Sequence, residues 1–74
     1  MEVNTLNLLG LKCPVPVLRA RKAFKILSSG SCVRVECSDP LSEIDIPHMC
    51  ITDGHELIDQ GHVDQLFWFL VRIK

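Results

Sequence analysis

Residues 14–28 read PVPVLRARKAFKILS, and this segment decides the fold. At the helical period of roughly 100° per residue, its apolar positions fall within an arc of about 120°, the width of a stripe that faces a core. Gly30 follows, and glycine favours the left-handed conformation that ends helices. We therefore predict an amphipathic helix over 14–28. Its core-facing residues are Pro16, Val17, Ala20, Ala23, Phe24 and Leu27. Its outward basic residues are Arg19, Arg21, Lys22 and Lys25.

Strands are predicted on both sides of this helix, over Thr5–Leu9 and Ser31–Ser38, because apolar residues alternate there. Leu6 and Leu8 are expected to point inward. In the second strand one face carries Val33, Val35 and Cys37, and the other carries Cys32, Arg34 and Glu36. A strand, a helix and a second strand in this order imply a right-handed crossover that joins two parallel strands.

A second helix is predicted after Asp39-Pro40, where an N-cap oxygen precedes a proline at the first helical position. Pro47 removes a helical hydrogen bond, so we expect this helix to kink or end near Ile46. Gly54 is the predicted terminator. The residues expected to line its inner side are Leu41, Ile44, His48 and Ile51.

The remaining residues predict two strands, His55–Asp59 and Leu66–Ile73, joined around Gly61. In the last strand Phe67, Phe69, Val71 and Ile73 share one apolar face, and Trp68 and Leu70 lie on the other. The predicted order is β-α-β-α-β-β. It corresponds to an α/β fold, a two-layer sandwich in which two helices cover one face of a four-stranded mixed sheet.

Length and composition predict one folded domain spanning residues 1–74. The chain is 47% hydrophobic and 23% charged, which excludes a disordered protein. It contains no apolar run of about 18 residues and no signal-peptide pattern, so neither a membrane span nor export is expected. We therefore expect a cytoplasmic protein whose four cysteines form no disulfide framework.

Charge is segregated along the chain although the net charge is only −1. Six basic residues and no acid lie between Lys12 and Arg34, whereas eight acids and no Lys or Arg lie between Val35 and Asp64. A protein with one positive and one negative region can dock to charged partners in a defined orientation. The alternative is two helices whose solvated faces differ in sign. Neither pattern gives the uniform basic surface that duplex DNA requires.

Cys13 is the residue predicted to carry chemistry, because it stands at the entry to the first helix. Unpaired N–H groups and the helix dipole favour a thiolate there, and Lys12 acts in the same direction. Such settings lower a cysteine pKa from about 8.5 to about 3.5–7.5. Pro14 and Pro16 stiffen the turn. We predict an exposed Cys13 with a lowered pKa; the alternative is a buried, inert capping cysteine.

The other cysteines and the histidines offer no second site. Cys32 and Cys37 lie on opposite faces of one strand and cannot pair directly. Cys50 lies near the end of the second helix, where packing is the simpler role. No Cys-x-x-Cys pair is present, and the three histidines fall on different elements. Neither a metal site nor an organic cofactor is expected.

Several motifs resemble the TusA/SirA family of small sulfur-carrier proteins. The likeness runs from Leu6 to Arg72 and centres on Cys13-Pro14-Val15-Pro16, the Cys-Pro-x-Pro signature. Further matches are Arg21-Lys22-Ala23, Ser38-Asp39-Pro40, Asp45-Ile46-Pro47, Cys50, His55-Glu56-Leu57 and Phe69-Leu70-Val71-Arg72. Some members carry an acidic residue between the two prolines, where this chain has Val15.

This resemblance implies that Cys13 carries sulfane sulfur as a persulfide. The donor would be a cysteine desulfurase or a rhodanese-like protein, and the acceptor another protein of the sulfur relay. Family pathways include tRNA thiolation, molybdenum-cofactor metabolism and sulfur oxidation. We expect a monomeric sulfurtransferase-type carrier rather than a turnover enzyme. Lys12, Pro14 and Pro16 would support the cysteine, and Arg19, Arg21 and Lys22 would dock the acidic rims of partners.

Two other functions remain open on sequence alone. A thiol-redox regulator would join Cys13 to a second cysteine in a disulfide. A non-catalytic interaction module would instead bind a partner through Trp68 and Leu70 on the uncovered face of the sheet.

Overall fold

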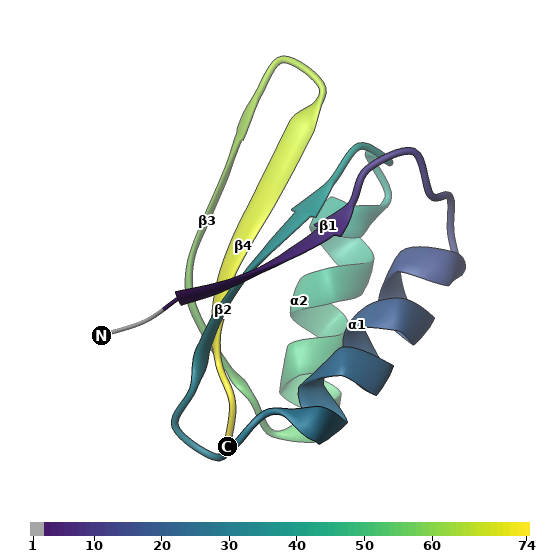
Figure 1. Ribbon diagram of the computed structural model, residues 1–74. Helices are drawn as coiled ribbons and strands as arrows, with labels where there is room; N and C mark the ends of the chain where they lie inside the picture. The colour runs from purple at the N-terminus through teal and green to yellow at the C-terminus, as the bar shows by residue number, and fades with distance from the viewer. Residues whose placement is uncertain (1–2) are drawn as a thin grey trace.

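The computed structural model describes residues 3–74 and contains four strands and two helices (Figure 1). In chain order these are β1 (Val3–Leu8), α1 (Val15–Ile26), β2 (Cys32–Cys37), α2 (Ser42–Asp53), β3 (Glu56–Val63) and β4 (Leu66–Arg72). The predicted order β-α-β-α-β-β is therefore confirmed.

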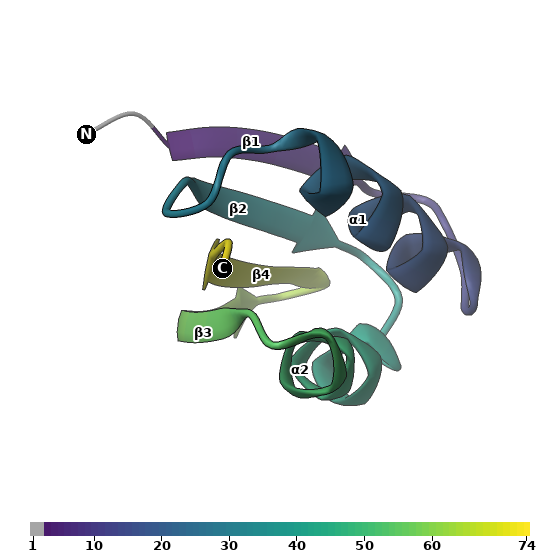
Figure 2. The same ribbon diagram turned by 90° about the horizontal axis from the view of Figure 1, so that it is seen from below.

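The four strands form one sheet in the order β1-β2-β4-β3. β1 pairs with β2 in parallel, and the other two pairings are antiparallel. Both helices lie on the same side of this sheet (Figure 2). The fold is thus the predicted two-layer α/β sandwich with a mixed sheet. Within residues 3–74, neither helix has the length and apolar composition that crossing a bilayer requires.

The core lies between the sheet and the helices, and α1 contributes the face that its periodicity predicts. Pro16, Ala20 and Phe24 are buried, and the other three predicted positions are partly buried. The apolar face of the last strand is also confirmed, since Phe67, Phe69, Val71 and Ile73 are each at most 7% exposed. Val33, Val35 and Cys37 on β2 complete the centre of this core.

The predicted inner face of α2 is wrong. Leu41, Ile44 and Ile51 are 52%, 68% and 79% exposed, and His48 is exposed as well. The residues that face the core are Ser42, Ile46, Met49 and Cys50. Ser42 can be buried because its hydroxyl donates a hydrogen bond of 2.7 Å to the carbonyl of Asp39. This bond fixes the rotation of the first turn of α2 and leaves the Leu41, Ile44 and Ile51 row outside.

The expected break of α2 at Pro47 is also absent, because the helix continues from Ser42 to Asp53 with this proline inside it. Proline lacks the N–H that would bond to the carbonyl of Glu43, four residues earlier. Glu43 is exposed, so water can satisfy that carbonyl. Gly54 ends the helix as predicted, with φ of 81° and its N–H bonded to the carbonyl of Ile51.

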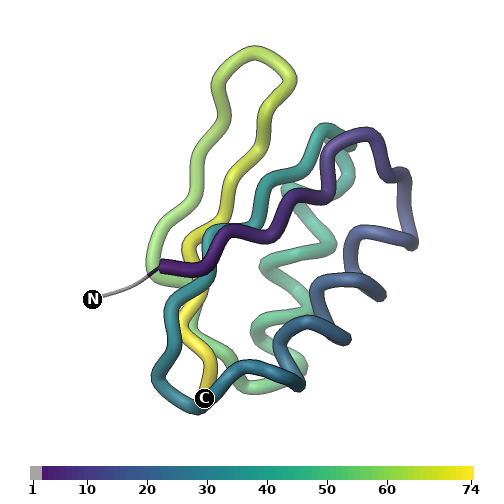
Figure 3. Tube along the Cα trace, viewed as in Figure 1, coloured from purple at the N-terminus to yellow at the C-terminus, as the bar shows by residue number. Residues whose placement is uncertain are grey.

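The predicted turn around Gly61 is wrong as well. β3 runs on to Val63, and the chain reverses at Asp64 and Gln65, so that Gly61 sits within the strand opposite Trp68. Asp64 adopts the left-handed φ of 53° that tight turns use. In the view of Figure 3 this hairpin extends past the ends of the other strands.

Candidate functional site

Cys13 lies in the loop between β1 and α1, and its side chain is exposed, as predicted. Two hydrogen bonds tie this loop to the segment that follows β2. The N–H of Cys13 donates to Oδ2 of Asp39 at 2.7 Å, and the N–H of Gly10 donates to Oγ of Ser38 at 2.7 Å. The two connections run side by side in Figure 3. The cysteine is therefore held at a defined place at one end of the molecule.

The helix begins directly after this cysteine. Pro14 is its N-cap residue, and Pro16 is the second residue of α1. The peptide bond between Cys13 and Pro14 is cis. Val15 donates its N–H to the carbonyl of Lys12 at 2.9 Å, which closes the turn. Of the three residues predicted to support Cys13, both prolines thus belong to the start of α1, and Lys12 lies on the exposed loop before it.

An open depression of about 250 Å³ adjoins Cys13, between the two helices. At the edge of this depression, Sγ of Cys13 lies 3.1 Å from Oδ2 of Asp45 and donates a hydrogen bond to it. This bond connects the loop before α1 to α2. The lining residues are Cys13, Pro14, Val17, Arg21, Asp45, His48 and Met49.

Asp45 is the residue of this site whose role sequence reasoning missed. It lies 32 positions after Cys13 and comes from the other helix, so no local pattern connects the two. The only signal is indirect, because Asp45 falls within one of the segments that match the family pattern.

The predicted lowering of the Cys13 pKa is wrong. The hydrogen bond to Asp45 raises the pKa of this thiol above its ordinary value, and partial desolvation and the negative charges of Asp45 and Asp39 act in the same direction. The backbone N–H of Cys13 bonds to Asp39 instead of stabilising a thiolate. That bond, with one from the N–H of Leu41, lowers the pKa of Asp39. The contacts of Cys13 therefore favour its thiol over its thiolate.

The three basic residues predicted for docking do not share one surface. Arg19 and Lys22 are exposed on α1. Arg21 lies at the boundary between the helices, not on the outer side as predicted, and its Nε donates to Oδ2 of Asp53 on α2 at 2.7 Å. This ion pair connects the two helices beside the depression.

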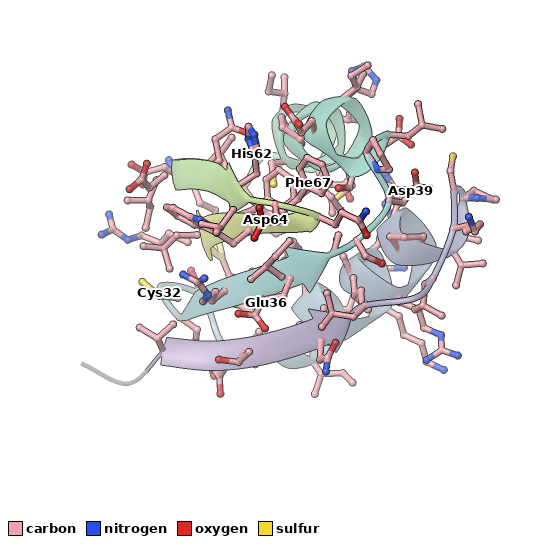
Figure 4. All side chains as sticks on the ribbon, turned by 90° about the horizontal axis from the view of Figure 1, so that it is seen from above. Cys32, Glu36, Asp39, His62, Asp64 and Phe67 are labelled. Atoms are coloured by element: carbon pink, nitrogen blue, oxygen red, sulfur yellow. The ribbon has the colours of Figure 1, made fainter. Side chains whose placement is uncertain are left out.

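The other three cysteines are buried, with exposures of 4% for Cys32, 0% for Cys37 and 1% for Cys50. Burial raises the pKa of Cys50 to about 11, and burial also raises the pKa of Cys37. Figure 4 shows Cys32 at the opposite end of β2 from Asp39, which bonds to Cys13. Within residues 3–74 no three His, Cys, Asp or Glu side chains are grouped so that they could hold a metal ion.

Trp68 lies on the sheet face that the helices leave open, as predicted, but it is partly buried there. The guanidinium of Arg34 lies 4.9 Å from the centre of its indole ring, and Nε of Arg34 donates to Glu36 at 2.9 Å. Contacts within the sheet therefore already occupy much of the indole surface that an interaction module would use.

Known proteins resemble this chain in sequence and in fold. Residues 4–73 match the protein family described as Sulfurtransferase TusA. The chain is 36% identical over 70 residues to the sulfur carrier protein TusA of Pseudomonas entomophila, covering 95% of this chain and 88% of the relative. It is 33% identical over 69 residues to the sulfur carrier protein TusA of Pseudomonas paraeruginosa, covering 93% and 87%.

A solved structure shares the same fold. It is the crystal structure of a SirA-like protein from Desulfitobacterium hafniense, with a TM-score of 0.81, 26% sequence identity and coverage of 96% of each chain. The family match covers residues 4–73, and the shared fold covers 96% of the chain. The chain therefore belongs to the TusA family of sulfurtransferases.

Proposed function

We propose that this protein is a sulfur carrier that holds sulfane sulfur as a persulfide on Cys13 and passes it from one protein to another. The observation that carries the proposal is the exposure of this cysteine in a loop that two hydrogen bonds tie to the segment after β2, beside an open depression. A carrier must present the same atom to two different proteins, so its reactive sulfur has to be accessible at the surface.

Loading begins when Cys13 loses its proton to solvent. The thiolate then attacks the outer sulfur of a donor persulfide, so that a new S–S bond forms on Cys13 and the donor's own S–S bond breaks. The donor cysteine leaves as a thiolate and the product is Cys13–S–S⁻. One sulfur atom moves, and no external oxidant or reductant is consumed.

Discharge repeats the same exchange with the roles reversed. An acceptor thiolate attacks the outer sulfur of the Cys13 persulfide, and Cys13 leaves as a thiolate that takes up a proton. Because both steps need a partner protein, the chain acts as a sulfurtransferase-type carrier and not as an enzyme that turns over a free substrate.

The partners that fit this role are a cysteine desulfurase or rhodanese-like donor and an acceptor protein of a sulfur relay. Arg19 and Lys22 give α1 an exposed basic face, which suits acidic rims around partner active sites. Thiolation of tRNA, cofactor synthesis and sulfur metabolism in the cytoplasm are the pathways that such a carrier would serve.

The thiol-redox alternative finds little support in the positions of the cysteines. An intramolecular disulfide needs two sulfur atoms that can approach within bonding distance. All three other cysteines are at most 4% exposed and lie in packed surroundings, so Cys13 could reach none of them without local unfolding.

Intact-mass measurement after incubation with a cysteine desulfurase and cysteine tests the proposal. We expect a gain of about 32 Da that a reducing agent removes, because a persulfide is a reversible sulfur adduct. The matched control is Cys13→Ala, which keeps the three buried cysteines and is expected to gain nothing. Equal loading of both proteins would contradict the assignment of Cys13 as the carrier.

A further inference from the structure

We propose that Asp45 is a positioning residue that favours the thiol form of the unloaded Cys13, so that compensating the charge of Asp45 speeds loading. This inference rests on the proposed carrier function of Cys13. It assigns to a residue of α2 control over when the sulfur becomes nucleophilic.

Both segments that form the contact between Cys13 and Asp45 are fixed in the fold. Asp45 is partly buried and precedes Ile46, which is fully buried and fixes this part of α2 in the core. The loop that carries Cys13 is bonded through its backbone to Asp39, just before α2. The distance of 3.1 Å between Sγ and Oδ2 therefore follows from the packing of the two segments, and not from two freely moving side chains.

Among residues 3–74, no ion pair neutralises the charge of Asp45. The three ion pairs within residues 3–74 join Arg21 to Asp53, Arg34 to Glu36 and Arg72 to Glu56. Arg21 lines the same depression as Asp45, but its guanidinium is bonded to Asp53. The titratable and charged groups around Cys13 are Lys12, Arg21, Asp39, Asp45 and His48.

A carboxylate in this position distinguishes between the two forms of the sulfur. The neutral thiol donates a hydrogen bond to Asp45, whereas a thiolate has no proton to donate and is repelled by the carboxylate. Deprotonation of Cys13 in the free carrier is therefore unfavourable. A cation that a docking protein brought against Asp45 would remove this repulsion and release the thiolate where the donor persulfide is present.

The test is the pH dependence of iodoacetamide alkylation at Cys13, followed by peptide mass. Asp45→Asn keeps the shape of the side chain and removes its charge, and we expect the midpoint of alkylation to fall by about one pH unit. Since a thiolate of lower pKa is a weaker nucleophile, the plateau rate at high pH should also fall, by about threefold. A purely structural role for Asp45 would not lower both quantities together.

Two further variants make this test specific. Asp64→Asn removes a carboxylate from the β3–β4 turn, and we expect it to leave the midpoint unchanged. Asp45→Ala is a second neutral variant, suited to a helix, for use if Asp45→Asn does not fold. An unchanged or raised midpoint in the folded neutral variants would overturn the proposal.

Loading with sodium polysulfide at pH 7 extends the same test to sulfur transfer. A pKa lowered by one unit raises the thiolate fraction about tenfold and lowers its nucleophilicity about threefold, so Asp45→Asn should load about threefold faster than the parent. Slower loading of this variant would also contradict the proposal. Alkylation does not depend on sulfur loading, so failure of the carrier function and failure of the Asp45 role are distinguishable.

Discussion

The indole ring of Trp68 on β4 lies directly against Gly61, its partner across the hairpin on β3. A Cβ at position 61 would stand 2.7 Å from Cζ2 and 2.9 Å from Cε2 of the indole. These distances are too short for carbon atoms in contact. Arg34 also contacts the ring, so the indole cannot move away without losing this interaction.

We therefore predict that Gly61→Ala lowers the free energy of unfolding by about 1–3 kcal/mol, the usual cost of inserting a methyl group into occupied space. Urea denaturation measures this change. The Trp68→Leu background is the control, because it removes the indole atoms that the new methyl group would meet. The same cost of Gly61→Ala in both backgrounds would show that the indole is not its cause.

Two isoleucines on α2 should differ sharply in their contribution to stability. Ile46 is 0% exposed, and we predict that Ile46→Ala lowers the free energy of unfolding by about 2–5 kcal/mol. Ile44 is 68% exposed, and Ile44→Ala should change it by less than about 0.5 kcal/mol. Chemical denaturation of both variants tests which face of α2 packs against the core. A larger loss at Ile44 than at Ile46 would contradict it.

Asp39 should make stability depend on acid pH. Two backbone hydrogen bonds hold its folded-state pKa below the ordinary value. The stabilisation is therefore present above the unfolded pKa of about 3.9 and is lost as pH falls through the lower folded value. We predict that Asp39→Asn is less stable than the parent at pH 7 and that the difference shrinks below about pH 4. Denaturation at several pH values measures it, and a constant difference would contradict the assignment.

The elements whose residues have one apolar face could be predicted from the sequence. In α1, Pro16, Ala20 and Phe24 are the buried residues of a single stripe. In β4, Phe67, Phe69 and Val71 form a wholly apolar face, whereas the opposite face carries Trp68 and Leu70 and ends in Arg72. When an element has only one apolar face, the spacing of its apolar residues alone determines which face packs against the core.

The second helix has two apolar rows, so the spacing of its apolar residues could not determine which row faces the core. The row of Leu41, Ile44 and Ile51 is more hydrophobic than the row that contains Ser42 and Cys50, yet it lies outside. The choice depends on the hydrogen bond from Ser42 to Asp39 and on the packing of Ile46, and both are visible only in three dimensions.

The exposure of Cys13 was predictable from the sequence, whereas the charged groups around it were not. Cys13 is exposed at the start of α1 because local residues place it there. Its raised pKa depends on Asp45, which the sequence separates from it by 32 positions. Helix termini and neighbouring lysines act locally and can be read from the chain, whereas a carboxylate brought in by another helix cannot.

The distribution of the four thiols has a consequence for the purified protein. Cys13 is exposed, whereas Cys32, Cys37 and Cys50 are buried. Air oxidation of the folded chain would therefore form a disulfide between the Cys13 residues of two molecules and no disulfide within one molecule. A preparation stored without reductant would then accumulate a species of doubled mass in which the Cys13 sulfurs are no longer free thiols.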